Sequence, residues 1–212
     1  ENITKDQILE LLEIMKTNRA NKITKYEKSK RKDYSAQPFI TSSIQQVAQK
    51  SLGLPIQKTM GILQNLYELG LITYHRTDCC QMSEQFIEKL KIFINEEFNK
   101  SYFYNKKSKK IKNSQEAHEP IRVTNLNSYK NVIKNENLKP IEIRLYLLIF
   151  QNSVQSHMKY ALYEDLKIEL TNTNINKYGV FYSTLSKLVN NGYLEFKNKF
   201  KELNSIMRKK EK

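Results

Sequence analysis

Residues 70–78 read Gly-Leu-Ile-Thr-Tyr-His-Arg-Thr-Asp and follow a helical pattern that stops at Gly70. Glycine often ends a helix, and the apolar run from Leu71 to Tyr74 then predicts a short strand. Successive side chains of a strand point to opposite faces, so Tyr74 and Arg76 are expected on the same face. This helix-glycine-strand unit is the basis from which the rest of the fold is predicted.

A phenol beside a guanidinium suits nucleophilic attack on a phosphodiester. Tyrosine is a weak nucleophile because its phenol is almost fully protonated near neutral pH. A fixed cation favours the phenolate and also attracts the phosphate under attack. Tyrosine is common in strands, however, so Tyr74 and Arg76 do not establish catalysis alone. We interpret His75 as a surface residue and the nearby Tyr67 as a core residue.

The composition predicts a polyanionic partner. The 212 residues carry 36 Lys and Arg against 22 Asp and Glu, a net charge of +14. Nucleic acid is the most frequent partner of so basic a protein, with an acidic protein or an anionic membrane surface as the alternative. The lysine-rich run at 106–112 fits a solvated loop and a phosphate-contacting loop equally well.

The sequence predicts no membrane span, because no apolar run is long enough, and no signal peptide at the N-terminal end. The two cysteines, Cys79 and Cys80, are adjacent. A disulfide between neighbours is strained, so we expect free thiols in a reducing compartment, the cytoplasm or the nucleoid or nucleus. Two cysteines do not make a zinc site, and no metal ligands are assigned to this chain.

Periodicity and end signals predict a mainly helical fold with short strands. An amphipathic helix covers 4–17, and a basic strand and linker cover 22–35. Ser42 has capping-box spacing to Gln45, which predicts a helix from there to about Ser51, and Pro55 opens the next helix, up to Gly70. Two helices followed by a strand are typical of a winged helix, whose second helix commonly docks on nucleic acid.

The second half of the chain predicts further elements of the same kinds. They are a helix from Ser83, a helix from Pro140 to about Met158, a strand at 166–170, a helix at 182–191 and a strand at 193–196. The last two segments repeat the first helix-glycine-strand unit at an offset of 122 residues. This repeat favours a second winged-helix-like module, although common packing demands alone could produce it.

Four sequence blocks stand in order between residues 38 and 124. They are Pro-Phe-Ile-Thr-Ser-Ser-Ile-Gln-Gln from Pro38, Gln-Asn-Leu-Tyr-Glu-Leu-Gly from Gln64, Ile-Thr-Tyr-His-Arg-Thr-Asp from Ile72, and Gln-Glu-Ala-His-Glu-Pro-Ile-Arg from Gln115. Together they closely resemble the type IA DNA topoisomerases of the bacterial topoisomerase I branch. A weaker fifth block at 145–158 extends the resemblance to about residue 160.

The resemblance implies a role for each matching residue. Tyr74 matches the nucleophile that opens one DNA strand and keeps its 5′ phosphate, Arg76 matches the cation that positions this phosphate, and His118 matches a phosphate-binding histidine. Taken alone, His118 would be an ordinary surface histidine. The implied DNA-binding residues are Gln64, Glu68, Glu119, Arg122, Thr41 and Ser42.

The resemblance also implies a domain organisation. Residues 1–37 match part of the gate domain with a basic linker, 38–137 a tyrosine-bearing winged-helix (CAP-like) domain, 138–176 the return helix and strand of the gate domain, and 177–212 a second winged-helix-like segment with a basic tail. The family's Mg²⁺ ligands lie in an N-terminal domain that has no counterpart here. We therefore expect a fragment or a reduced relative, with that domain in cis or in trans.

The resemblance favours a topoisomerase core that binds single-stranded or underwound DNA and cleaves it weakly alone. The alternative is a non-catalytic DNA-binding protein of two winged helices. A protein-interaction domain whose charge serves solubility alone is a third interpretation. The block containing His118 distinguishes the first two interpretations. A topoisomerase core needs this block close to Tyr74, whereas a simple DNA-binding module does not.

Overall fold

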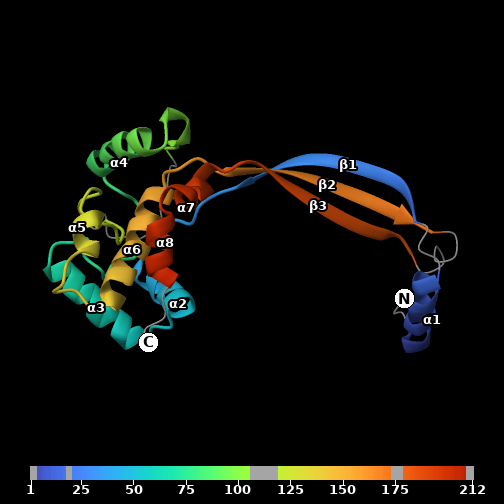
Figure 1. The fold of residues 1–212 in the computed structure, drawn as a ribbon, viewed down its shortest axis with the longest axis horizontal. Coiled ribbons are helices and arrows are strands. Elements are labelled where there is room, and N and C mark those ends of the chain that lie inside the picture. The colour runs from blue at the N-terminus through green and yellow to red at the C-terminus, as the bar shows by residue number, and fades with distance from the viewer. Residues whose placement is uncertain (1–3, 18–20, 106–118, 173–178, 209–212) are drawn as a thin grey trace. The chain divides into compact units, whose positions relative to one another are not determined.

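The computed structural model describes residues 4–17, 21–105, 119–172 and 179–208 (Figure 1). The chain divides into two compact units, one formed by residues 1–33 and 161–190 and the other by residues 34–160 and 191–212. The long insertion 34–160 thus separates the two parts of the first unit in sequence.

The first unit contains a three-stranded antiparallel sheet of order β1-β2-β3. The strands are β1 (Lys22–Asp33), β2 (Ala161–Thr171) and β3 (Phe181–Asn190). At 10 to 12 residues they are long, so the expectation of only short strands was wrong. Helix α1 (Lys5–Thr17) belongs to the same unit, and none of its residues is buried.

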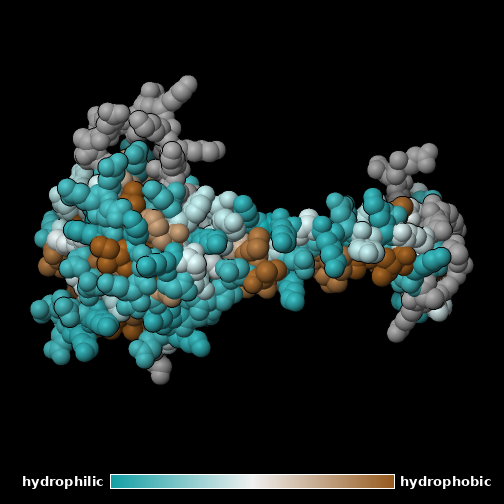
Figure 2. All heavy atoms as spheres, turned by 90° about the horizontal axis from the view of Figure 1, so that it is seen from above, coloured by the Kyte–Doolittle hydropathy of each residue, from teal (hydrophilic) through white to brown (hydrophobic). Residues whose placement is uncertain are grey.

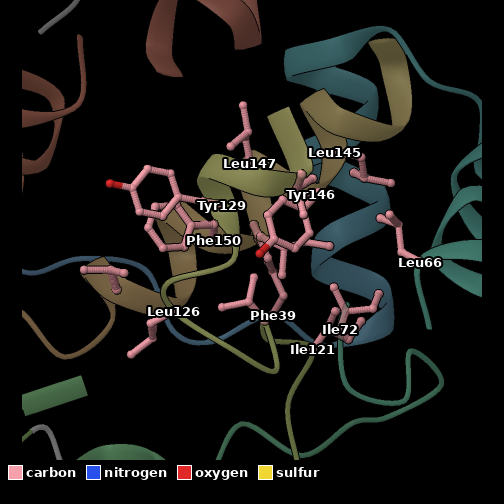
Figure 3. Packing of buried hydrophobic residues seen from close by; sticks show 14 of the residues in the cluster. Phe39, Leu66, Ile72, Ile121, Leu126, Tyr129, Leu145, Tyr146, Leu147 and Phe150 are labelled. Atoms are coloured by element: carbon pink, nitrogen blue, oxygen red, sulfur yellow. The ribbon is translucent and has the colours of Figure 1, made fainter. Parts of the chain in front are cut away.

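The second unit is helical and is built around α6 (Pro140–Gln155), which contacts helices from both ends of the unit. Its side chains Leu145, Tyr146 and Phe150 are fully buried (Figure 3). The remaining helices are α2 (Thr41–Leu52), α3 (Ile56–Glu68), α4 (Glu84–Glu97), α5 (Tyr129–Ile133), α7 (Glu195–Lys199), α8 (Lys201–Arg208) and the 3₁₀ turns η1 (Lys100–Tyr102) and η3 (Gly192–Leu194).

Glycine ends α3 as predicted, with a φ of 67° at Gly70. This left-handed conformation costs glycine little. The backbone N–H of Gly70 donates to Tyr67 O at 2.8 Å, and that of Leu71 donates to Leu66 O at 3.0 Å. These bonds close the helix and turn the chain toward Ile72, which is buried in the core (Figure 3).

Several predicted elements differ in the structure. The strand expected at 71–74 is reduced to a single antiparallel bridge between Ile72 and Val123. Helix α2 begins at Thr41, and Ser43 rather than Ser42 accepts the backbone N–H of Ile40, at 3.0 Å. Sequence spacing alone did not distinguish these neighbouring serines.

The prediction for the segment 177–212 as a second winged-helix-like module was wrong in its elements. The expected helix at 182–191 is the strand β3, and the expected strand at 193–196 is the turn η3 followed by α7. Pairing with β2 accounts for the difference, because the spacing of residues within 182–191 does not reveal a contact with a strand 11 to 28 positions away. The offset-122 repeat therefore has no counterpart in structure.

Candidate functional site

Three of the four sequence blocks meet in the helical unit. The first block bridges the fourth through Phe39 and Ile121, and the third bridges Val123, the residue directly after the fourth block, through Ile72. Both bridges are antiparallel, and the backbone N–H of Ile121 donates to Phe39 O at 2.8 Å. Phe39, Ile72 and Ile121 also lie together in the core (Figure 3).

Helix α6 holds two of these segments through buried polar side chains. The carboxamide of Asn152 accepts the backbone N–H of Phe39 at 3.0 Å and donates to Gln37 O at 2.9 Å. The neighbouring Ser153 hydroxyl accepts the backbone N–H of Val123 at 3.3 Å. Since buried polar groups are costly when unpaired, these bonds favour one arrangement of the segments on α6.

Exposure alternates along the segment that carries Tyr74. Tyr74, Arg76 and Asp78 are exposed, whereas His75 and Thr77 are buried. The Tyr74 side chain is 39% exposed and that of His75 only 1%, so the interpretation of His75 as a surface residue was wrong. The alternation presents a phenol and a guanidinium to solvent from an irregular segment.

Thr41 ties the C-terminal side of this segment to the start of α2. Its hydroxyl donates toward the carbonyl oxygens of His75 and Thr77 at 2.9 and 3.0 Å, and accepts the backbone N–H of Thr77 at 2.9 Å. The backbone N–H of Thr41 also donates to Thr77 O at 2.9 Å. Thr41, whose side chain was predicted to contact DNA, is thus hydrogen-bonded to the segment that carries Tyr74.

Thr73 ties the N-terminal side of the segment to residues 120–122. Its hydroxyl donates to Pro120 O at 2.6 Å and accepts the backbone N–H of Arg122 at 3.0 Å. Its backbone N–H donates to Arg122 O at 2.9 Å. Tyr74 therefore stands directly beside one anchored residue, and the carbonyl of the next residue, His75, is bonded to Thr41.

The ring of Tyr74 packs against two other rings. Its centroid lies 5.4 Å from that of Tyr67 and 5.5 Å from that of His75. Tyr67 is 40% exposed, so its assignment to the core was wrong. Burial, and secondarily the charge of Arg76, lowers the pKa of His75, which keeps this imidazole neutral near neutral pH.

Glu119 and Arg122 form an ion pair with each other. The Glu119 carboxylate also accepts the backbone N–H of Ser83 at 3.0 Å, and the Arg122 guanidinium donates to Val123 O and lies 3.8 Å from the Phe86 ring centroid. Burial opposes ionisation of Glu119, but hydrogen bonds from Ser83 and Arg122 outweigh it and lower its pKa. The pair links the fourth block to α4.

The remaining predicted residues occupy the surface or lie outside the described residues. Gln64 and Glu68 are exposed on α3, and the Gln64 amide donates to the Glu68 carboxylate at 2.6 Å. Ser42 is exposed on α2. His118 lies outside the described residues, although Glu119 next to it is held near Ser83.

Sequence reasoning missed Thr73 as an anchor and the ring contacts of Tyr67 and His75. Spacing gives one signal for Tyr67, because it lies in the last turn of a helix, seven positions before Tyr74. Thr73 gave none, since its partners are 47 and 49 residues away.

Within the described ranges, no three His, Cys, Asp or Glu side chains come together as a metal site. The residues present thus do not fit the Mg²⁺ expected for the complete enzyme. None of the helices described is both long and apolar enough to cross a membrane. Cys79 and Cys80 are free in the structure.

A family model described as DNA topoisomerase matches residues 1–211, almost the whole chain. The chain belongs to the DNA topoisomerase family. This confirms the resemblance to the type IA enzymes that the four blocks indicated.

Named relatives agree with the family model. The chain is 36% identical over 182 residues to DNA topoisomerase 1 of Helicobacter pylori, a match that covers 81% of this chain and 24% of the relative. It is 34% identical over 200 residues to DNA topoisomerase 1 of Campylobacter jejuni, covering 89% of this chain and 28% of the relative. The chain thus spans about a quarter of the length of these relatives.

A solved structure supports the fold. Full-length topoisomerase I from Thermotoga maritima matches with a TM-score of 0.76 and 29% sequence identity. The match covers 88% of this chain and 31% of that chain.

Proposed function

We propose that this chain carries the strand-cleaving tyrosine of a type IA DNA topoisomerase, and that the residue is Tyr74. One observation carries the proposal: an exposed phenol stands on a segment anchored by Thr73 on one side and by Thr41 on the other, with Arg76 exposed beside it. Fixed placement of a nucleophile is a large part of its reactivity.

In the proposed reaction, the phenolic oxygen of Tyr74 attacks the phosphorus of a DNA phosphodiester. The bond from phosphorus to the 3′ oxygen of the preceding nucleotide breaks, and this oxygen leaves with a proton as a 3′ hydroxyl. The 5′ phosphate remains on Tyr74 as a phosphodiester. Because one such bond replaces another, the 3′ hydroxyl can attack it later and reseal the strand after another strand has passed.

Arg76 is the proposed phosphate-positioning group, because its side chain is exposed, as that of Tyr74 is, and stands two residues from it. His118 remains a proposed phosphate-binding residue, next to the anchored Glu119. Gln64, Glu68 and Ser42 are proposed to line the path of the DNA strand, as the exposed helix residues of their blocks.

For Thr41, Glu119 and Arg122 the geometry favours positioning over direct DNA contact, because each is engaged with other protein groups. The Arg122 side chain is only 11% exposed. We infer that these residues hold the segments around Tyr74, whereas a DNA contact remains the prediction of the resemblance.

The proposed assembly needs groups beyond this chain. Mg²⁺ and its acidic ligands, and the acid that would protonate the leaving 3′ oxygen, are proposed to lie in the further domain typical of the family, in cis or in trans. Residues 38–137 are the proposed tyrosine domain of winged-helix type, and 1–37 with 138–176 the proposed gate-domain parts. Single-stranded or underwound DNA is the proposed substrate, in the cytoplasm or the nucleoid or nucleus.

A non-catalytic DNA-binding protein is the weaker proposal. Membership in the topoisomerase family does not favour it. The convergence of the first, third and fourth blocks around Tyr74 also counts against it, because binding alone does not require a nucleophile to be fixed there.

The proposal is tested by determining which end of a cleaved DNA strand stays attached to the protein. Single-stranded oligonucleotides labelled at the 5′ or the 3′ end are incubated with the chain and Mg²⁺ and then denatured. We expect a small amount of covalent complex that retains the 3′ label and disappears in Tyr74→Phe. A complex that retains the 5′ label, or that survives in Tyr74→Phe, would contradict the proposal.

A further inference from the structure

The two faces of the β1-β2-β3 sheet differ sharply in charge. The strand register assigns each side chain to a face, because directly paired residues of neighbouring strands share one. One face, here the basic face, carries four lysines and one acid: Lys28, Lys30, Lys32, Lys187 and Glu164. The other, the balanced face, carries four cations and four acids: Lys22, Lys25, Arg31, Lys167, Glu27, Asp33, Asp165 and Glu169.

Two of the four cations of the balanced face, Arg31 and Lys167, are engaged within the sheet. Arg31 Nε lies 2.8 Å from Asp165 Oδ2, and its guanidinium carbon lies 4.5 Å from the Tyr163 ring centroid. Lys167 Nζ lies 4.7 Å from the Tyr182 ring centroid. The four cations and four acids of this face also balance each other, so it carries no net charge.

Three of the four lysines of the basic face, Lys28, Lys30 and Lys187, remain available in the described part of the chain. Among the residues that the structure describes, no acid pairs with Lys28, Lys30 or Lys187 within ion-pair distance. Lys28 and Lys30 stand on β1, which is an edge strand, so an extended ligand can lie along them. Residues two apart on a strand are roughly 6.6 Å from each other, which gives a regular row of positive charges.

Aromatic and apolar side chains accompany this row. Tyr26 is two positions from Lys28 and 67% exposed, while Leu185, opposite Leu166, is 57% exposed. Figure 2 shows hydrophobic side chains gathered along one side of the sheet. The basic face thus combines a row of cations and an exposed aromatic ring with a set of apolar side chains, Leu162, Leu166, Ile168, Leu170, Phe181 and Leu185.

We propose that the basic face of the sheet binds a single-stranded nucleic acid, whose phosphates follow Lys28 and Lys30 of β1 while a base stacks on Tyr26. Cations that track a backbone, joined by aromatic rings that stack bases, are the usual means of holding single strands without sequence preference. The excess of positive charge on this face favours a polyanion as the partner. The proposal does not depend on Tyr74, which lies in the other compact unit.

Salt dependence of binding by the full chain tests the cation row. Variant K28Q/K30Q/K187Q removes three lysines of the basic face, and K22Q/K25Q/K167Q removes the same charge from the balanced face. With a labelled thymidine oligonucleotide, the first variant should lower the slope of log affinity against log salt by about 2, at about 0.7 per lost phosphate contact. The second should leave the slope near that of the unchanged chain.

Two tyrosines of similar exposure on opposite faces test stacking. Tyr26→Ser should weaken binding about tenfold, near the lower end of the stacking contribution of one base. Tyr182 is 59% exposed on the balanced face and serves as the control. Tyr182→Ser should change the affinity less than twofold, well below the ~tenfold effect of losing one stacked base. Circular dichroism of each variant verifies that the sheet is intact.

If Tyr26→Ser or the lysine variant unfolds the sheet, the binding test uses the unchanged chain instead. A halogenated uridine oligonucleotide is photocrosslinked to that chain, and the crosslinks should map to β1 around Tyr26. Equal effects of the two lysine variants would overturn the proposal, as would crosslinks confined to the helical unit. Unchanged DNA affinity with an altered oligomeric state in the basic-face variant would assign this face to protein contacts instead.

Discussion

Thr41 and Thr73 show at the residue scale how a short segment acquires a defined conformation without regular secondary structure. Each threonine uses its hydroxyl as both donor and acceptor toward backbone groups on a different segment. A hydroxyl can do this at one position only if the partner segments are already fixed, and α6 provides that support through Asn152 and Ser153.

Replacing Thr41 by valine should destabilise the helical unit by roughly 1–3 kcal/mol, because the backbone groups of His75 and Thr77 lose a buried partner. Urea unfolding measures the change. Thr41→Ser keeps the hydroxyl and should recover most of the stability, whereas equal losses in both variants would show that the methyl group matters instead.

His75 predicts a pH dependence of stability. Its pKa in the folded chain lies below the ordinary value of 6.5, so the unfolded chain binds more protons as the pH falls below about 6.5. Folding should therefore weaken over that range, and His75→Phe, which keeps an aromatic ring beside Tyr74, should weaken less. Unfolding free energies measured across this pH range compare the two proteins, and parallel curves would contradict the assigned cause.

At the scale of elements, β3 shows where sequence reasoning fails. Leu185 and Leu188 have the spacing of a helix face, yet in β3 they pair with Leu166 and Tyr163 on opposite faces of the sheet. Strong local signals succeeded by contrast: Pro140 opens α6, and Gly70 follows the end of α3. The residue pattern within one segment did not predict an element that is stabilised by pairing with another strand.

Two glycines with positive φ should respond differently to alanine. A Cβ on Gly192 would lie 2.1 Å from the backbone oxygen of Tyr160, whereas a Cβ on Gly70 would meet nothing within 4 Å. Gly70→Ala should cost about 1 kcal/mol for its left-handed backbone. Gly192→Ala should cost clearly more, and thermal unfolding of both variants would reveal similar losses if η3 can shift away from Tyr160.

On the scale of the whole molecule, the family was more predictable than the fold. The blocks that carry Tyr74, Arg76 and Glu119 were recognisable because they resemble those of the family and stand in the same order. Their anchoring was not, because the bonds of Thr41 and Thr73 join residues 34 to 49 positions apart. The contrast between the sheet faces likewise needed the strand register.

The chain alone should bind single-stranded DNA well and cleave it poorly. A net charge of +14 favours binding, and affinity should fall steeply with salt. Cleavage should be weak because the resemblance assigns both the Mg²⁺ ligands and the acid for the leaving group to a further domain. Abundant cleavage by the chain alone, measured with labelled oligonucleotide on a denaturing gel, would refute this division of roles.

The position of the covalent bond to DNA tests the central claim most directly. The covalent complex is digested with protease and nuclease, and the residue that carries the nucleotide is located by mass spectrometry. We predict Tyr74. The nearest competitor is Tyr67, whose ring lies 5.4 Å away and is equally exposed. A nucleotide on Tyr67 or on any other residue would contradict the account.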